Sequence, residues 1–221
     1  MQIRATDEDF YHWYTQGDGK RVFEQESLLI KPLIKHFKPY RTLFIGDIVF
    51  KDLPESTVVV GVSDRYLAKN KVVVDPTLLP FQKAYFDLII CPHWHEVSES
   101  PLALFSELSR VLMPQGLLVC YSMNPHGLYR LEKNLRRADT LNWQQQQYTP
   151  NQIEATVQRW DLERAYHFYA VHYQPWHPKY YAFPGIRSTQ LVGMIHETVL
   201  KKSLPGTMTA SVSEAQWAAS F

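Results

Sequence analysis

The stretch that decides the fold is residues 88–121, LIICPHWHEVSESPLALFSELSRVLMPQGLLVCY. Residues 88–91 continue a strand that begins at Phe86, residues 117–121 form a second strand, and both are continuously apolar. Such strands are typical of a parallel sheet that is covered on both faces, because an exposed face would require alternating polar residues. A polar loop at residues 92–96 and a helix separate them. The stretch therefore predicts a strand, a crossover helix and a parallel strand, which is the unit of an α/β fold.

The segment between the two strands carries the signals of a helix. Ser100 suits the N-cap, and Pro101 suits the first helical position, where its missing N–H costs nothing. A helical period places five apolar side chains on one face, namely Leu104, Phe105, Leu108, Val111 and Leu112. Residues 113–116, MPQG, then end the helix, since Pro cannot continue it and Gly tolerates a positive φ. We expect the apolar face to pack against the sheet.

Further apolar segments extend this unit into a larger sheet. Short strands are predicted at residues 41–45, 57–62 and 71–74, and two longer ones, at 166–173 and 190–199, are expected to pair antiparallel. Residues 46–56 are too few for a full crossover helix between parallel strands. The predicted fold is a Rossmann-like, mostly parallel sheet flanked by helices, with an antiparallel C-terminal strand pair.

Three further helices are expected around the sheet. The first lies within residues 1–40, where Pro32 must kink or restart it. The second covers residues 128–137, and the third begins at Thr149, whose capping box is completed by Gln152. These helices supply the layers that a parallel sheet needs on its two faces.

The chain is expected to form one domain over residues 1–205. Its 221 residues fit a single core, and no linker or internal repeat divides them. Within the domain, residues 1–40 form an N-terminal helical cap, residues 41–131 the Rossmann-like core, and residues 132–205 the C-terminal helix and strands. Residues 206–221 are expected to be a flexible tail.

Composition excludes several classes of function. With 45% hydrophobic and 20% charged residues the chain reads as a folded globular protein. A net charge of +1 argues against a nucleic-acid or anionic-membrane partner, which usually requires a basic excess. Cys91 and Cys120 lie in apolar strands, as small buried residues do, and form neither a disulfide framework nor a zinc motif. Without a membrane-length apolar run or a signal-peptide core, a cytoplasmic location is expected.

Polar residues follow the predicted strands at one edge of the sheet. Gly46 and Asp47 follow the first strand, Asp64 the second, Asp75 the third, and the loop at 92–97 the fourth. In an open α/β sheet, ligands bind outside the carboxyl ends of the strands. These residues therefore predict a site for a nucleotide-like ligand.

An ordered run of motifs resembles the class I S-adenosylmethionine-dependent methyltransferases, in particular the type-11 methyltransferase domain group. The residues that carry the resemblance are Asp75-Pro-Thr-Leu-Leu-Pro-Phe81, Phe86-Asp-Leu-Ile-Ile90, His95-Glu-Val97, Glu107, Arg110-Val-Leu112, Pro114, Gly116 and Asn124-Pro125. The likeness is firm over residues 41–131, weaker over the rest, and closest to a small bacterial subgroup. It implies S-adenosylmethionine as the cofactor and a small molecule as the methyl acceptor.

The resemblance also implies which residues line the site. Those expected at the cofactor are Gly46, Asp47, Asp64, Asp75, Pro76, Thr77, Leu78 and Pro92. By this likeness Asp64 hydrogen-bonds the ribose hydroxyls, and Asp75 with the backbone of residues 77–78 faces the adenine. From the residues alone, Asp75 serves equally as a cap for loop amides, and Asp64 as part of a solvated turn.

His93 and His95 are the candidate catalytic residues near the acceptor. An imidazole that titrates near neutrality suits a general base that deprotonates the attacking nucleophile. A metal site is not expected, because the nine histidines are scattered and none has the spacing of a helical zinc site.

The first loop departs from the family's pattern. Only Gly46 remains of a glycine-rich run, and Ile48 and Phe50 stand near positions where further glycines are expected. Side chains there occupy space near the methionine end of the cofactor. Two hypotheses follow: a methyltransferase that acts on a small molecule, or a methyltransferase-fold protein without activity that serves as a binding or scaffolding module. A third is a binder of another adenine-containing ligand through Asp64 and Asp75.

Overall fold

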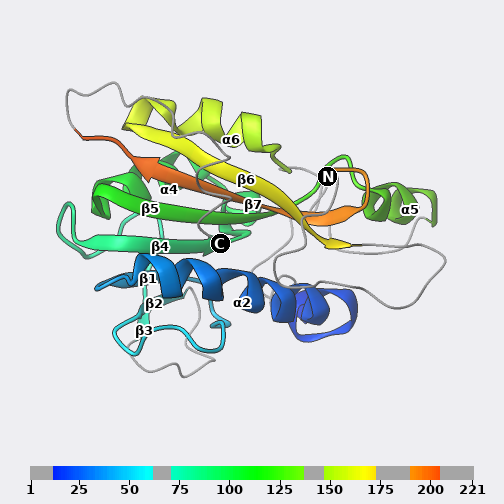
Figure 1. Cartoon of the computed structure of the whole chain (residues 1–221), viewed down its shortest axis with the longest axis horizontal. Helices are drawn as coiled ribbons and strands as arrows, with labels where there is room; N and C mark the ends of the chain where they lie inside the picture. The colour runs from blue at the N-terminus through cyan, green and yellow to red at the C-terminus, as the bar shows by residue number, and fades with distance from the viewer. Residues whose placement is uncertain (1–11, 62–70, 137–146, 173–189, 205–221) are drawn as a thin grey trace.

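The computed structural model describes residues 12–61, 71–136, 147–172 and 190–204 of the chain (Figure 1). In this part of the chain the strands form one seven-stranded sheet of order β3-β2-β1-β4-β5-β7-β6. Its strands are β1 (Thr42–Ile45), β2 (Val58–Gly61), β3 (Lys71–Val73), β4 (Phe86–Pro92), β5 (Leu112–Met123), β6 (Leu162–His172) and β7 (Gly193–Lys202). Strands β1 to β5 pair parallel, whereas β7 pairs antiparallel with both β5 and β6. The predicted fold class is confirmed.

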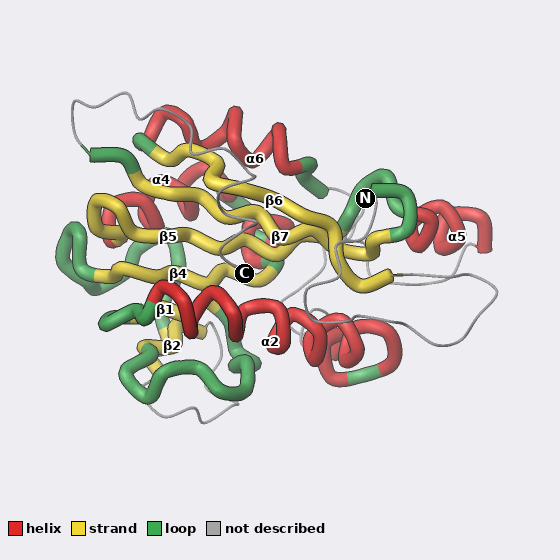
Figure 2. The backbone as a smooth tube through the Cα atoms, viewed as in Figure 1, coloured by secondary structure: helices red, strands yellow, loops and turns green. Residues whose placement is uncertain are grey.

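Helices cover both faces of the sheet (Figure 2). They are α2 (Gly17–Phe37), α3 (Trp94–Val97), α4 (Pro101–Val111), α5 (Leu128–Arg136), α6 (Pro150–Val157) and the 3₁₀ helix η2 (Gln158–Trp160). Helices α2 and α5 contribute to the hydrophobic core on one face, and α4 and α6 to the core on the other. The capping box predicted at Thr149 is present, with Gln152 as its partner. None of the described helices is both long and apolar enough to cross a membrane.

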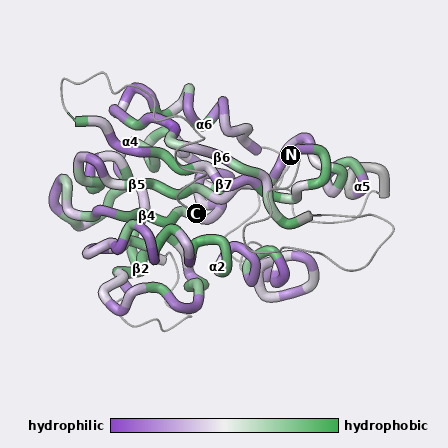
Figure 3. The backbone as a smooth tube through the Cα atoms, viewed as in Figure 1, coloured by the Kyte–Doolittle hydropathy of each residue, from purple (hydrophilic) through white to green (hydrophobic). Residues whose placement is uncertain are grey.

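The central strands lie between the two cores. Leu88 and Ile90 of β4 belong to the core under α2, whereas Ile89 and Cys91 belong to the core under α4. Alternate residues of a strand point to opposite faces, so a strand with a core on each side must be apolar throughout. Hydrophobic residues are accordingly prominent along the central strands, and hydrophilic ones along the outer helices (Figure 3).

The structure corrects three local predictions. Residues 92–96, expected as a loop, include helix α3, and His93 precedes that helix in the left-handed conformation with φ 58°. Strand β5 begins at Leu112 rather than residue 117, because the backbone there pairs with Phe86 before a register shift. Ser100 stands at the N-cap of α4 but makes no capping hydrogen bond through its side chain.

Other boundaries agree with the sequence or move by a few residues. Helix α2 continues through Pro32 as one element. No helix lies between β1 and β2 in residues 46–57, as the length of that segment predicts. Strands β6 and β7 begin four residues before and three residues after their predicted starts, at residues 162 and 193. The tail predicted at residues 206–221 lies outside the described residues.

Candidate functional site

The strand order places the carboxyl ends of β1 and β4 side by side. Strand β1 pairs with β2 on one side and with β4 on the other, so the chain changes direction across the sheet at this point. Such a reversal opens a crevice above the sheet, and ligands of α/β proteins bind there. Ligand contacts are therefore expected from the residues that follow β1 and β4.

Gly46 follows β1 directly and lies close to the side chain of Trp94. A Cβ atom at Gly46 would lie 3.1 Å from the ring of Phe44 and 3.3 Å from Nε1 of Trp94. Trp94 is 5% exposed, and its indole N–H has no hydrogen-bond partner among the described residues. A buried donor without a partner costs free energy, so this atom marks a position where a ligand acceptor would be stabilised.

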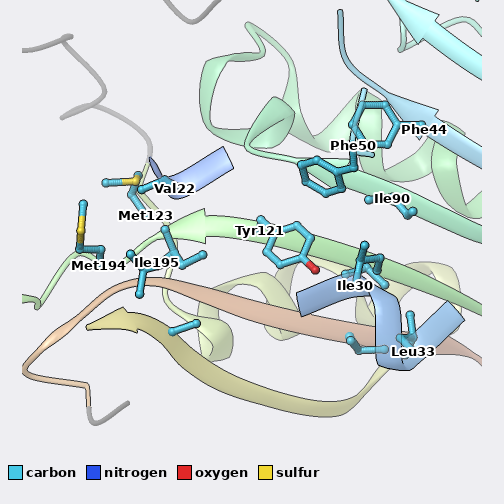
Figure 4. Close-up of a cluster of buried hydrophobic side chains, with 14 of the residues drawn as sticks. Val22, Ile30, Leu33, Phe44, Phe50, Ile90, Tyr121, Met123, Met194 and Ile195 are labelled. Atoms are coloured by element: carbon cyan, nitrogen blue, oxygen red, sulfur yellow. The ribbon is translucent and has the colours of Figure 1, made fainter. Parts of the chain in front are cut away.

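Phe50 contributes an aromatic core side chain from the same loop. Its ring lies 5.1 Å from that of Phe44, 5.3 Å from that of Phe23 and 5.8 Å from that of Tyr121, measured between centroids. Figure 4 shows Phe50 beside Phe44 in this cluster. The loop after β1 therefore contributes an aromatic side chain to the core on this face of the sheet.

Asp47, predicted to contact the cofactor, forms a buried ion pair with Lys71. Nζ of Lys71 lies 2.8 Å from Oδ1 of Asp47, and the two side chains are only 6% and 9% exposed. The pair crosses the end of β2 above Gly61, where an added Cβ would lie 2.2 Å from Oδ1 of Asp47. A glycine is thus required at residue 61 to make room for the pair. Sequence reasoning missed Lys71, because a lysine that opens a strand usually faces solvent.

Residues 75–78 form the loop that was predicted to face adenine. Hydrogen bonds within this loop hold its conformation. Oδ1 of Asp75 accepts hydrogen bonds from the backbone N–H and the hydroxyl of Thr77, both at 2.8 Å. Asp75 is exposed, Pro76 is buried, and Leu78 is 75% exposed. The capping role of Asp75 is thus observed, while its contact with adenine stays a prediction. Asp64 lies outside the described residues.

His93 is buried between two carboxylates at the carboxyl end of β4. Its Nε2 lies 2.8 Å from Oε1 of Glu26 in helix α2, and its Nδ1 lies 2.5 Å from Oε2 of Glu96 in helix α3. Burial alone lowers the pKa of His93, but the two carboxylates outweigh it and raise that pKa to about 9. At neutral pH the imidazole is therefore a cation that donates two hydrogen bonds. This arrangement suits positioning better than general-base catalysis.

The two carboxylates are themselves held by further buried groups. The hydroxyl of Tyr14 donates to Oε2 of Glu26 at 2.6 Å, and the backbone N–H of Met123 lies 3.1 and 3.2 Å from the two oxygens of Glu96. Tyr14, Glu26, His93 and Glu96 form what we call the His93 cluster, which joins α2 to the ends of β4 and β5. Sequence analysis missed Glu26, although a glutamate at helical spacing within the apolar stripe of α2 was the available signal.

His95 lies on the opposite face of the sheet from His93. Its Nε2 lies 2.8 Å from the hydroxyl oxygen of Ser122, and its ring lies 5.6 Å from Phe105 and 5.8 Å from Tyr148. Burial, followed by the charge of His93, lowers the pKa of His95 well below its usual value, so the ring is neutral. The structure therefore does not bring the two predicted catalytic histidines together. Pro92, which was predicted to contact the cofactor, is the last residue of β4 and is buried.

The described residues contain no group of three histidine, cysteine, aspartate or glutamate side chains that could hold a metal ion. The remaining candidates for ligand contact are Gly46 at the end of β1, Trp94 at the start of α3, and the residue 75–78 loop.

The seven-stranded sheet, with its antiparallel C-terminal strands, has the class I methyltransferase fold. Residues 52–120 match a protein family described as a methyltransferase domain. This confirms the resemblance to S-adenosylmethionine-dependent methyltransferases. A comparison with the sequences of curated proteins gives no match.

Solved structures of methyltransferases share this fold. A Thermotoga maritima S-adenosylmethionine-dependent methyltransferase, described as a possible histamine N-methyltransferase, is 12% identical, with a TM-score of 0.66 over 89% of this chain and 96% of that one. An Archaeoglobus fulgidus S-adenosylmethionine-dependent methyltransferase is 18% identical, with a TM-score of 0.55 over 84% and 100% of the two chains. The N-methyltransferase NodS from Bradyrhizobium japonicum, in complex with S-adenosylhomocysteine, is 14% identical, with a TM-score of 0.53 over 88% and 97%. At these identities the likeness establishes the fold.

Proposed function

We propose that the chain transfers a methyl group from S-adenosylmethionine to a small-molecule acceptor. The observation that carries the proposal is the unpartnered indole N–H of Trp94, which is buried against Gly46 where the sheet changes direction. The fold supplies the crevice, Gly46 permits close approach of a ligand, and Trp94 offers a donor for a ligand oxygen. These three features fit the carboxylate end of the cofactor.

The cofactor supplies a methyl group on a sulfonium centre, and the protein's task is to orient the acceptor for in-line displacement. In this proposal Gly46 and Trp94 hold the methionine end of the cofactor. The loop at residues 75–78 faces the adenine and Asp64 the ribose, as the resemblance implies. The His93 cluster fixes the end of β4 and the start of α3, on which Trp94 lies.

Neutral His95 remains the candidate proton acceptor in this proposal. Its Nδ1 has no hydrogen-bond partner among the described residues, and its depressed pKa leaves the ring neutral at physiological pH. His93 acts as a positioning residue, because both of its ring nitrogens are held by carboxylates.

A calorimetric titration with S-adenosylmethionine and S-adenosylhomocysteine tests the proposal. We expect dissociation constants on the order of micromolar for the unaltered chain. Trp94→Phe keeps the apolar ring but removes the donor, so affinity should fall about tenfold, as for a lost hydrogen bond to a charged group. Trp160→Phe, in η2, is the matched control and should not change affinity. Asp75→Ala should weaken binding if the residue 75–78 loop contacts adenine.

A second candidate function has its own support. Phe50 packs tightly in the aromatic cluster and Asp47 is bound to Lys71, so two positions of the first loop already serve the protein's own packing. These contacts favour a methyltransferase-fold protein that serves as a binding or scaffolding module without catalysis. Absence of heat and of any thermal shift with both nucleosides at about millimolar concentration would support this function and exclude the first. Binding of adenosine alone would instead favour an adenine-containing ligand of another kind.

A further inference from the structure

The ion pair between Lys71 and Asp47 covers the carboxyl end of β2. Nζ of Lys71 lies 2.8 Å from Oδ1 of Asp47. The pair lies over Gly61, the last residue of β2, where an added Cβ would overlap both Oδ1 of Asp47 and Cε of Lys71. Ligands of open α/β sheets bind outside the carboxyl ends of the strands. Two charged side chains of the chain itself therefore occupy space at the edge of the sheet where a ligand is expected.

The ion pair is also beside the proposed cofactor contact at Gly46. Asp47 follows Gly46 directly in the chain. The backbone N–H of Gly46 donates to the carbonyl oxygen of Val60 at 2.8 Å, and Val60 immediately precedes Gly61. This hydrogen bond joins the end of β1 to the end of β2. The two charges therefore lie next to the residue that we assign to the methionine end of the cofactor.

The burial of this ion pair determines which ligands can separate it. The side chains of Lys71 and Asp47 are only 6% and 9% exposed, so both charges have lost most of their contact with water. A buried charge whose partner is removed is strongly destabilised, because the attraction within the pair no longer offsets the cost of desolvation. A ligand that separates the pair must therefore give each side chain a new partner of opposite charge. An uncharged ligand supplies neither partner, and a ligand with a single charge supplies only one.

The amino-acid end of the proposed cofactor carries both of the charges required. At about pH 7 its α-carboxylate is negative and its α-amino group is a positive ammonium. The carboxylate accepts hydrogen bonds from an ammonium such as that of Lys71, and the ligand's ammonium donates to a carboxylate such as that of Asp47. The exchange replaces one ion pair within the protein by two with the ligand. No buried charge is then left without a partner.

We infer that the ion pair between Lys71 and Asp47 opens to bind the amino-acid end of the cofactor, with the carboxylate on Lys71 and the ammonium on Asp47. This inference rests on the proposed function, and it names the residues that distinguish the complete cofactor from its nucleoside part. A carboxylate has two oxygens, so it also leaves an acceptor for the indole N–H of Trp94. Without ligand, the same two charges hold the loop after β1 against β3. The ion pair is thus the closed state of the site.

Two ligands that differ in the amino-acid end test the inference. S-adenosylhomocysteine carries both charges, whereas methylthioadenosine has the same nucleoside and thioether with neither charge. Calorimetric titration of the full chain with each ligand gives the ratio of the two dissociation constants, which we call the zwitterion preference. We expect S-adenosylhomocysteine to bind at least about tenfold more tightly, because it alone forms charged hydrogen bonds with the ion-pair residues.

Variants of the ion pair should lower the zwitterion preference. Asp47→Asn keeps the shape of the side chain and removes its charge, so affinity for S-adenosylhomocysteine should fall at least about tenfold. Lys71→Met should act in the same direction, whereas Lys71→Arg keeps the charge and should keep the preference. Affinity for methylthioadenosine should stay the same in all three variants, which also shows that each variant is folded. Lys31→Met, in the exposed ion pair with Asp52, is the matched control and should change neither affinity.

Equal affinities of the unaltered chain for the two ligands would overturn the inference and leave the proposed function in place. An unchanged zwitterion preference in both Asp47→Asn and Lys71→Met would do the same. A parallel loss of affinity for both ligands in these variants would also overturn it, because the ion pair would then only maintain the fold. If neither ligand binds at about millimolar concentration, the proposed function itself fails, and this inference fails with it.

Discussion

Nε2 of His93 lies 2.8 Å from Oε1 of Glu26, and both side chains are fully buried. The contact joins the end of β4 to helix α2, which is 67 residues earlier in the chain. It also holds His93 in a left-handed backbone conformation that a non-glycine residue adopts only when its surroundings fix it. Helix α3 begins at the next residue, Trp94. The ion pair thus sets the position of the donor that we assign to the cofactor.

Removal of His93 should strongly destabilise the protein. His93→Ala would leave Glu26 and Glu96 facing each other in a buried site without a cation, which costs about 3 to 5 kcal/mol of unfolding free energy. Urea denaturation of the variant measures this loss. His126→Ala, on an exposed turn, is the control and should behave as the unaltered chain does. A loss no greater than that of the control would show that the cluster does not stabilise the fold.

The contribution of His93 to the free energy of unfolding should depend on pH within a defined range. Its pKa is raised from 6.5 to about 9 in the folded protein, so folding binds the proton more tightly. The stabilisation is therefore complete below about pH 6.5 and disappears as the pH rises through about 9. It amounts to at most about 3 kcal/mol, at about 1.36 kcal/mol per pKa unit.

Urea denaturation of the unaltered chain and of His93→Gln between pH 6 and pH 9.5 measures this dependence. The difference in unfolding free energy between the two should shrink across that range. A difference that stays constant would mean that His93 is neutral in the folded protein.

Glu197 should carry a stability cost that a neutral side chain relieves. Its pKa is raised from 4.5 to about 7 by burial, so its contribution to stability is present below about pH 4.5 and is lost as the pH rises through about 7. Glu197→Gln should therefore be more stable than the unaltered chain above pH 7, by at most about 3 kcal/mol. Thermal unfolding at about pH 8 provides the comparison, with Glu99→Gln as control. A Gln variant that is less stable at that pH would indicate a cationic partner that already compensates Glu197.

The buried Lys71–Asp47 ion pair should contribute more to the free energy of unfolding than the exposed Lys31–Asp52 ion pair. Lys71→Met leaves Asp47 buried without its cation, and we expect a loss of about 3 kcal/mol in unfolding free energy. Lys31→Met breaks an ion pair of 2.7 Å with Asp52, but both side chains are exposed, so the change should be small. Equal effects in urea denaturation would contradict the assignment of the Asp47 pair as a structural element.

A substitution at Phe50 distinguishes between the two candidate functions. Phe50→Ala opens a cavity in the aromatic cluster and should cost about 3 to 5 kcal/mol in stability. If the chain binds S-adenosylhomocysteine at Gly46, the loosened loop should bind it more weakly. If the ring instead fills the cofactor space, the variant should gain affinity. Leu108→Ala, in the opposite core, controls for general loss of stability and should leave affinity unchanged.

The sequence predicted the fold because its signals are local and repeated. Apolar strands on both sides of the helix at residues 101–112 require a parallel unit covered on two faces, and the capping box at Thr149 fixes the start of α6. The structure confirms both. The antiparallel pair at the C-terminal end followed from two long strand-like segments, although their boundaries moved by a few residues.

The site was less predictable because it depends on contacts distant in sequence. Nothing near residue 93 indicates that Glu26 lies against it, and without that contact neither the left-handed backbone nor helix α3 is expected. Lys71 reaches Asp47 only because Gly61 leaves space between them. Both His93 and His95 were predicted near the acceptor, whereas a left-handed turn at His93 and the start of helix α3 at Trp94 direct the two side chains to opposite faces of the sheet.

The central claim is that Trp94 donates to a cofactor bound beside Gly46, and its indole N–H resonance tests this most directly. The chain has six tryptophans, and the Trp94 signal is identified by its absence from the spectrum of Trp94→Phe. Titration with S-adenosylhomocysteine should move this signal downfield and saturate with the calorimetric dissociation constant. A Trp94 signal that stays in place while the nucleoside binds, or that stays in place because nothing binds, would contradict the account.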